Sequence, residues 1–265
     1  MSRSFFVTGT DTGVGKTLVT AALLRRLRES GVTVAGMKPV AAGAVAGPEG
    51  PANSDALLLQ LESSVRHPYV LVNPWLFELA IAPHIAAAEA GVVIDTDRIV
   101  KAHEILRASA DVVLAEGAGG FLVPLDARRS FAELPGLLGM EVLLVVGLRL
   151  GCLNHALLTS DAIAARGYRL AGWVGNCIDP AFARRDANTL PRHRSLAAAS
   201  GRRRGGGGTG RRCHAAAGLS RRRSAASFWI QRGKSRCGWL LRPLRCAGRE
   251  PAIRWPPSRE SGCPS

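Results

Sequence analysis

Residues 9–17 read Gly9-Thr10-Asp11-Thr12-Gly13-Val14-Gly15-Lys16-Thr17, and this stretch decides the fold. It follows the apolar run 5–7 and opens a segment with leucines at helical spacing. Small residues let backbone N–H groups converge on phosphate oxygens, and the N-terminus of a helix favours an anion. Lys16 can reach the β- and γ-phosphates, and the Thr17 hydroxyl can ligate Mg²⁺. The stretch therefore predicts a P-loop for a nucleoside triphosphate, although five residues, not the standard four, separate its first glycine from Gly15.

Apolar runs alternate with helical patterns along the first part of the chain. Strands are expected at residues 5–7, 32–36, 111–115, 141–146 and 170–174, and helices at 18–28, 55–61, 98–109 and 154–166. Continuously apolar strands separated by helices are typical of a parallel sheet covered on both sides. The predicted fold class is therefore α/β, a P-loop NTPase fold with a parallel β-sheet flanked by helices on both faces.

Charge divides the chain in two. Residues 1–186 hold 17 basic and 18 acidic side chains, whereas residues 187–265 hold 18 basic and two acidic ones. The α/β pattern also stops near residue 186. We expect a P-loop domain over 1–186 and a basic tail of low order over 187–265. The tail therefore carries a net charge of +16 and the domain −1, so a nucleic-acid partner is not expected for the domain.

Two interpretations of residues 187–265 stay open. One is a basic, disordered tail that touches nucleic acid. The other is an out-of-frame translation of a GC-rich gene, which would yield Arg, Gly, Ala, Pro, Cys and Trp with few acidic residues. The runs 202–204 (Arg) and 205–208 (Gly) and the isolated Trp and Cys residues favour the second interpretation. Resequencing codons 180–200 distinguishes the two.

Cysteine usage and hydropathy indicate the compartment. The six cysteines include no C-x-x-C pair, so they match neither a zinc site nor a small disulfide framework. The apolar run 5–7 is too short for a signal peptide, and no run approaches the roughly 20 apolar residues of a membrane helix. We expect a cytoplasmic protein with no membrane contact.

Three further charged residues are candidates for the phosphate site. Glu116 ends an apolar strand and Asp55 begins a helix, so each could ligate Mg²⁺ or be a surface or helix-terminal acid. Lys38 follows the second strand, and Pro39 disfavours a helical conformation there. Ligands bind at the carboxyl ends of parallel strands, but a solvated lysine fits the position of Lys38 equally well.

Together these motifs resemble dethiobiotin synthetase. The ordered matches cover about residues 4–180 and include the five-residue spacing of the loop. The P-loop alone would not separate this family from many other ATPases. The matching segments are residues 9–17, Lys38-Pro39-Val40, Asn53-Ser54-Asp55-Ala56-Leu57, Pro83-His84, Glu116-Gly117-Ala118-Gly119-Gly120, Gly151-Cys152-Leu153-Asn154-His155 and residues 171–176.

The resemblance implies that Mg-ATP, CO₂ (or bicarbonate as its source) and 7,8-diaminopelargonic acid are converted to dethiobiotin. One amine would take up CO₂ as a carbamate, whose oxygen attacks the γ-phosphoryl group and releases ADP. The second amine would attack the carbonyl of the carbamic–phosphoric anhydride, and phosphate leaves as the ring closes. The resemblance also implies a homodimer.

The resemblance assigns roles to individual residues. Lys38, Lys16 and Thr12 would be catalytic, and Thr17, Asp55 and Glu116 would hold Mg²⁺. The nucleotide would contact Gly13, Val14, Gly15, Lys16, Thr17, Leu18, Asp55, Glu116, Gly117, Ala118, Gly119, Asn176 and Cys177, with Asn176 at the adenine. The substrate would contact Thr12, Lys38, Ala42 and, across the dimer interface, Gly151, Cys152, Leu153 and Asn154, which are expected to precede a helix and offer N–H groups to an anion.

Three departures from the family pattern bear on activity. Gly13 stands where many relatives have an acid, and Ala42 stands where relatives often have Ser or Thr. A family loop of the Leu-Gly-x-Ile-Pro type, on the adenine side, is not recognisable after Asp186. We therefore expect this chain to be weakly active or of low stability.

Two other classes of protein stay open. One is another ATPase of the same branch, such as a cobyrinic acid amide synthase, although the glutamine-hydrolysing domain common there is not visible. The other is a nucleotide-binding partition or switch protein whose basic tail grips DNA. That class often carries a second lysine within the loop, and residues 10–14 have none.

Overall fold

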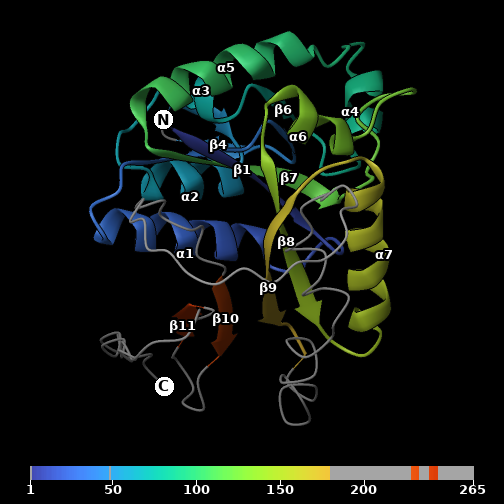
Figure 1. Ribbon diagram of the computed structural model, residues 1–265. Helices are drawn as coiled ribbons and strands as arrows, with labels where there is room; N and C mark the ends of the chain where they lie inside the picture. Colours follow the sequence, from blue (N-terminus) through green and yellow to red (C-terminus); the bar gives the residue numbers. More distant parts are fainter. Residues whose placement is uncertain (1, 48, 180–227, 233–238, 244–265) are drawn as a thin grey trace, which may run out of the picture.

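A computed structural model describes residues 2–47, 49–179, 228–232 and 239–243 (Figure 1). Its centre is a five-stranded sheet in the order β2-β7-β1-β8-β9, with all neighbouring strands parallel. This confirms the predicted fold class. The strands are β1 (Arg3–Gly9), β2 (Val34–Met37), β7 (Val112–Gly120), β8 (Glu141–Leu148) and β9 (Leu170–Cys177).

Helices cover both faces of this sheet (Figure 1). Successive strand residues point to opposite faces, so Phe6 and Val7 of β1 enter different cores. Val7 packs with the helices α1 (Lys16–Glu29) and α2 (Ser54–Glu62). Phe6 packs on the other face with α5 (Thr96–Ser109), while α7 (Cys152–Ala165) covers β8 and β9.

A glycine in β2 allows α1 and α2 to approach the sheet closely. A Cβ on Gly36 would lie 2.8 Å from the Cβ of Leu59 on α2 and 2.9 Å from Cδ1 of Leu24 on α1. The two helices are also joined by Glu62, which is only 2% exposed and accepts hydrogen bonds from Arg25 and Arg28. This face of the sheet is therefore tightly closed below the carboxyl ends of its strands.

The predicted helix at 55–61 is present as α2, but residues 40–52, 69–89 and 131–137 form short elements that the sequence analysis did not anticipate. They are three or four residues long for the most part, so no helical or alternating pattern reveals them. β3 (Val40–Ala42) pairs in parallel with β6 (Trp75–Phe77), and β4 (Val45–Gly47) pairs with β5 (Gly50–Ala52) in antiparallel fashion. The helices are α3 (Tyr69–Val72), α4 (Pro83–Glu89), the 3₁₀ helix η1 (Phe131–Glu133) and α6 (Leu134–Leu137).

Within the predicted tail, the described residues form β10 (Phe228–Arg232) and β11 (Trp239–Pro243), which pair in antiparallel fashion. The remainder of 187–265 and the region of Asp186 lie outside the described residues. The predicted absence of the adenine-side loop concerns these same residues. Among the helices of the described part of the chain, none is long and apolar enough to cross a membrane.

The predicted element boundaries need one correction that matters for the site. Residues 151–154 were expected to precede a helix, but α7 begins at Cys152, so this expectation is wrong for three of the four residues. Gly151 is the N-cap and has a left-handed φ of 89°, which a glycine adopts at no steric cost. Cys152, Leu153 and Asn154 therefore form the first turn of the helix, where backbone N–H groups have no partner within the helix.

Candidate functional site

The P-loop joins the carboxyl end of β1 to the N-terminus of α1. Gly13 and Gly15 have left-handed φ angles of 73° and 84°, which residues other than glycine rarely adopt. A Cβ on Gly15 would also lie 2.1 Å from Nδ2 of Asn176. Inside the loop, Nζ of Lys16 donates a hydrogen bond of 2.9 Å to the carbonyl oxygen of Asp11. The loop thus has the conformation and the helix that a phosphate site requires.

Lys16 carries a perturbed amine. The residue is 7% exposed, and burial lowers its pKa from 10.5 to about 8, although the nearby Glu116 carboxylate opposes this shift. A bound phosphate would supply negative charge beside the amine and favour its protonated form. The Lys16 amine is therefore suited to binding an anionic ligand such as a phosphate group.

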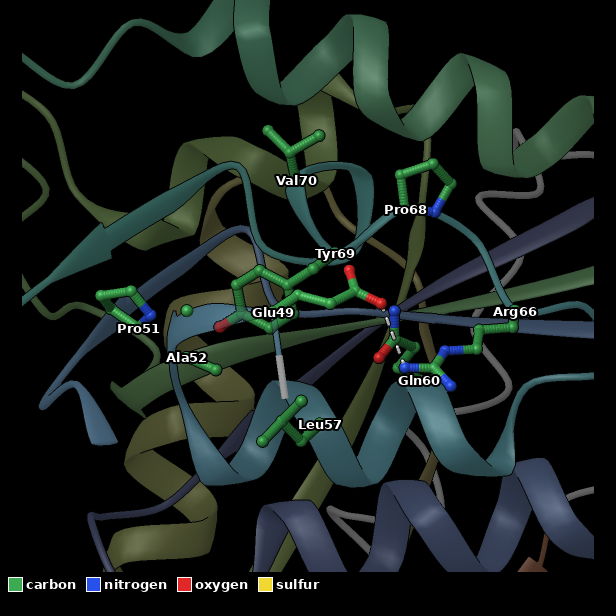
Figure 2. A pocket seen from close by; sticks show the side chains of 10 residues that line it. Glu49, Pro51, Ala52, Leu57, Gln60, Arg66, Pro68, Tyr69 and Val70 are labelled. Atoms are coloured by element: carbon green, nitrogen blue, oxygen red, sulfur yellow. Dashed lines mark hydrogen bonds and ion pairs between the residues drawn. The ribbon is translucent and has the colours of Figure 1, made fainter. Parts of the chain in front are cut away.

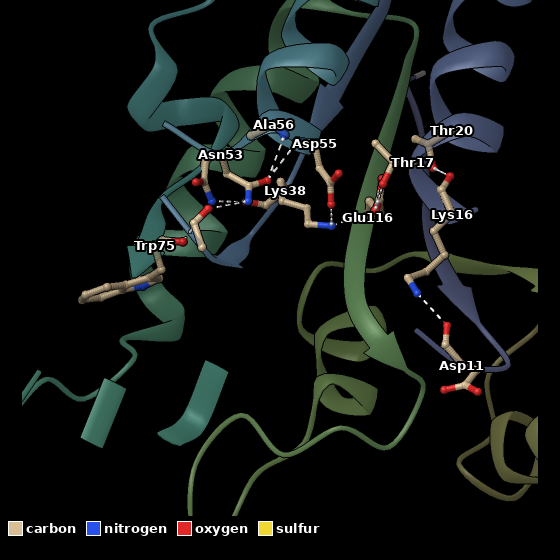
Figure 3. A network of polar contacts seen from close by, with 12 residues as sticks. Asp11, Lys16, Thr17, Thr20, Lys38, Asn53, Asp55, Ala56, Trp75 and Glu116 are labelled. Atoms are coloured by element: carbon tan, nitrogen blue, oxygen red, sulfur yellow. Dashed lines mark hydrogen bonds and ion pairs between the residues drawn. The ribbon is translucent and has the colours of Figure 1, made fainter. Parts of the chain in front are cut away.

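A buried lysine–carboxylate cluster lies beside the loop (Figure 3). Nζ of Lys38 donates to Oε1 of Glu116 at 2.7 Å and to Oδ2 of Asp55 at 2.9 Å. Oε1 of Glu116 also accepts a hydrogen bond of 2.8 Å from the hydroxyl of Thr17. Lys38 follows β2, Glu116 lies in β7, and Asp55 and Thr17 are the second residues of α2 and α1. Four residues singled out from the sequence therefore meet at one edge of the sheet.

The cluster keeps Lys38 positively charged. Lys38 is 4% exposed and Glu116 is fully buried, whereas the side chain of Asp55 is 39% exposed. Burial alone would lower the pKa of Lys38, but the Glu116 and Asp55 carboxylates outweigh it and raise that pKa above its usual value. This ammonium group is therefore a fixed positive charge at the carboxyl end of the sheet.

The oxygen atoms of this cluster fit Mg²⁺. Oε2 of Glu116 is buried and has no hydrogen-bond partner among the described residues. Together with Asp55 and the Thr17 hydroxyl, it offers the carboxylate and hydroxyl oxygens that Mg²⁺ prefers. The described part of the chain holds no group of three or more His, Cys, Asp or Glu side chains placed for a metal. An ion here would depend on phosphate and water oxygens for its other ligands, which is usual for Mg²⁺.

Asn176 contacts the P-loop directly. Its Nδ2 donates 2.9 Å to the carbonyl oxygen of Val14, and the residue is 5% exposed. Its Oδ1 is buried and has no partner within the described chain. The next residue, Cys177, donates from Sγ to the carbonyl oxygen of Asp179 at 3.4 Å. The end of β9 thus borders the loop and presents an acceptor that a ligand could use.

The end of β7 lies against the other side of the loop. Gly119 has a left-handed φ of 62°, and a Cβ there would lie 3.4 Å from Oγ1 of Thr12. Gly117 packs on Phe6, since a Cβ on it would lie 2.9 Å from that ring. Thr12 therefore faces β7, the strand that carries Glu116 and Ala118. A side chain at Gly119 would fill the space between this strand and Thr12.

Residues 149–154 connect to the P-loop through a salt bridge that the sequence analysis missed. Nη2 of Arg149 lies 2.6 Å from Oδ2 of Asp11, and Oδ1 of Asp11 accepts from the N–H of Thr12. Arg149 follows the carboxyl end of β8, which is the positional signal that could have indicated it. The first turn of α7 is thereby tied to the loop. Leu18 is the third residue of α1, whereas Ala42 ends β3 and its role as a substrate contact stays a prediction.

A separate pocket of about 320 Å³ is lined by other residues than those of the cluster (Figure 2). At its rim Arg66 lies 3.4 Å from Glu49, and both side chains are exposed. The other lining residues are Gly50, Pro51, Ala52, Leu57, Gln60, Pro68, Tyr69 and Val70. None of the predicted site residues lines this pocket.

A parallel sheet, a P-loop at the end of β1 and a buried lysine–carboxylate cluster beside it define a P-loop nucleoside triphosphatase. A protein family described as an AAA domain matches residues 3–206. The ATP-dependent dethiobiotin synthetase of Aromatoleum aromaticum is 53% identical over 196 residues, which are 73% of this chain and 86% of that protein. The enzyme of the same name from Ralstonia nicotianae is 51% identical, over 71% of this chain and 82% of its own.

These relatives show that the chain belongs to the family of ATP-dependent dethiobiotin synthetases. Among solved structures, the MinC:MinD cell division complex of Aquifex aeolicus is 19% identical, with a TM-score of 0.43 over 70% of this chain and 73% of that one. The family resemblance drawn from the sequence motifs is confirmed. Of the classes left open, the relatives favour dethiobiotin synthetase over an amide synthase or a partition protein.

Proposed function

We propose that the chain converts 7,8-diaminopelargonic acid, CO₂ and ATP to dethiobiotin, ADP and phosphate. Family membership supports the choice of reaction. The single observation that carries it in the structure is the Lys38 ammonium, which is buried and charged beside the P-loop, 2.7 Å from Glu116 and 2.9 Å from Asp55. This second fixed positive charge fits a reaction in which an anionic substrate must approach the γ-phosphate.

The proposed reaction brings two anions together. A carbamate oxygen must approach the γ-phosphoryl group, and repulsion between the two would oppose this approach. Lys16 would neutralise the γ-phosphate and Lys38 the carbamate, in a site where fixed charges act strongly. Asp55 is half-exposed, so its carboxylate could leave Lys38 and let the carbamate take its place. Thr12 would donate its hydroxyl to the carbamate from the opposite side.

The metal and the nucleotide complete the proposed site. Thr17, Asp55 and Glu116 would hold Mg²⁺, which neutralises phosphate charge when bound. Oδ1 of Asn176 would accept a hydrogen bond from the adenine amino group, which supplies the partner that this buried atom lacks. The other nucleotide contacts proposed are Gly13, Val14, Gly15, Leu18, Gly117, Ala118, Gly119 and Cys177.

The proposal extends to the substrate, the assembly and the tail. Ala42 would line the diamine, and the first turn of α7, from Gly151 to Asn154, would bind its carboxylate across the interface of a homodimer. The N-terminus of α7 supports this, because Gly151 and Asn154 are exposed there and N–H groups at a helix N-terminus attract an anion. We also propose a cytoplasmic location and a functional domain that ends near residue 186.

Release of ADP tests the proposal. It should depend on both the diamine and bicarbonate, and Lys38→Ala should abolish it while ATP still binds. ATP turnover without the diamine would contradict the proposal. A chain whose reading frame is restored after residue 186 should be run beside this one, and no turnover in either would also refute it. Strongly salt-sensitive, tail-dependent binding of DNA would instead favour a partition or switch protein.

A further inference from the structure

We propose that Tyr69 and Asn73 are positioning residues that hold the Lys38–Asp55 pair in place for reaction. Both lie outside the P-loop, on or just after the short helix α3. The expected effect on catalysis rests on the function proposed above. The hydrogen bonds that support the positioning role are those of this chain and do not depend on that function. Neither residue is expected to touch ATP, CO₂ or the diamine.

The backbone of Lys38 is held on both sides by the turn that ends α3. The N–H of Lys38 donates to the carbonyl oxygen of Val72 at 2.7 Å. Its own carbonyl oxygen accepts a hydrogen bond of 2.7 Å from Nδ2 of Asn73. The direction in which the Lys38 side chain leaves the backbone is therefore set by these two residues.

Asn73 uses all of its hydrogen-bonding groups for this purpose. It is 3% exposed, and its second amide hydrogen goes to the carbonyl oxygen of Trp75 at 2.9 Å. Its Oδ1 accepts from the hydroxyl of Tyr69, also at 2.9 Å. A buried amide in such a network has one stable orientation, because any rotation leaves buried polar atoms unpaired.

The Tyr69 hydroxyl extends the network to Asp55. It accepts a hydrogen bond of 2.7 Å from the N–H of Asn53. Asn53 caps α2, since its Oδ1 accepts from the N–H groups of Asp55 and Ala56 at 3.1 and 3.3 Å. One hydroxyl thus joins the backbone of Lys38, through Asn73, to the helix start that carries Asp55. Figure 3 shows Asp55 joined by hydrogen bonds both to the Asn53 cap and to Lys38.

Tyr69→Phe is the sharpest test, because it removes this hydroxyl and keeps the half-buried ring. A displacement of reacting groups by a fraction of an ångström lowers turnover without weakening substrate sites elsewhere. We expect kcat for diamine-dependent ADP release to fall about 10-fold, with KM for ATP changed less than about twofold. A loss of packing alone would instead reduce ATP binding and thermal stability together with kcat.

The chain offers a matched control, because Tyr168 is its second and last tyrosine. No hydrogen bond of the Tyr168 hydroxyl is present among the described residues, and this ring packs in the core under α7. Tyr168→Phe should therefore leave kcat unchanged. Equal kcat values for Tyr69→Phe and Tyr168→Phe would overturn the proposal, as would a parallel loss of kcat and ATP affinity in Tyr69→Phe.

A second measurement separates this inference from the proposed function. Acetylation of Lys38 by acetic anhydride, followed by mass spectrometry, reports how well the buried amine is held and needs no turnover. It should be several-fold faster in Tyr69→Phe than in the wild type or Tyr168→Phe, because a displaced lysine loses its carboxylate partners and reacts more readily. If the wild type shows no diamine-dependent release, the proposed function fails, and the acetylation rates alone decide whether Tyr69 positions Lys38. Unchanged rates would refute that.

Discussion

Replacing Lys38 by methionine removes one charge from the cluster and keeps much of the length of the side chain. Glu116 then remains fully buried without its hydrogen-bonded Lys38 cation, and only the Thr17 hydroxyl still donates to its Oε1 at 2.8 Å. Removing one partner of a buried ion pair typically costs about 3–5 kcal/mol, because the remaining charge is desolvated and unpaired. Asp55 adds little, since its side chain is 39% exposed and water can solvate it.

Equilibrium unfolding in urea measures this loss. We expect the free energy of unfolding of Lys38→Met to be lower than that of the wild type by about 3–5 kcal/mol, which is a large part of the roughly 5–15 kcal/mol of a typical protein. The double variant Lys38→Met/Glu116→Gln should recover most of the loss, because glutamine at 116 carries no charge. Neither variant should release ADP in response to the diamine.

Two results would refute this reasoning. A loss below about 1 kcal/mol in Lys38→Met would mean that Glu116 is hydrated or protonated rather than buried as a carboxylate. A double variant no more stable than the single one would mean that lost packing, not an unpaired charge, explains the effect. Leu158→Ala, on an exposed part of α7, is a control that should change the free energy of unfolding little.

Further predictions concern pH and close packing. Burial lowers the pKa of His103 from 6.5 to about 4, so the free energy of unfolding should fall as the pH drops from 6.5 to 4, and urea titrations should show a weaker fall in His103→Gln. Because the pKa of Lys16 is lowered to about 8, ATP affinity measured by calorimetry should decline above pH 8 in the wild type but not in Lys16→Met. Gly15→Ala should abolish ATP binding in the same assay, since its Cβ would lie 2.1 Å from Asn176. Gly36→Ala should lower thermal stability by about 1–3 kcal/mol, because its Cβ meets α1 and α2; an unchanged melting temperature would contradict this packing.

The P-loop and the residues around it could be predicted because their positions follow from topology. Lys38 and Glu116 each lie near the carboxyl end of a parallel strand, and such ends share one edge of the sheet. A strand followed by a glycine-rich turn and a helix is likewise a local pattern that needs no long-range information. Sequence reasoning left a solvated Lys38 and a functional one open on position alone, and the structure excludes the solvated alternative because Lys38 is buried between two carboxylates.

The supporting residues could not be predicted from a pattern. Tyr69 and Asn73 act through hydrogen bonds to backbone groups at positions 38 and 53, which are 16 or more residues away along the chain. Such contacts leave no period in the sequence. Gly151 was assigned correctly to the region before α7. Its role as N-cap depends on a left-handed φ, which glycine allows but which the presence of a glycine does not predict.

The most direct test of the central claim is to supply ¹³C-bicarbonate with ATP and the diamine and to analyse the product by mass spectrometry. We expect a product whose mass equals that of the diamine plus one labelled CO₂ minus one water, formed in equal amounts with ADP and absent in Lys38→Ala. ADP formed with no labelled product would contradict it, because the P-loop and Lys38 would then serve ATP hydrolysis and not ring closure.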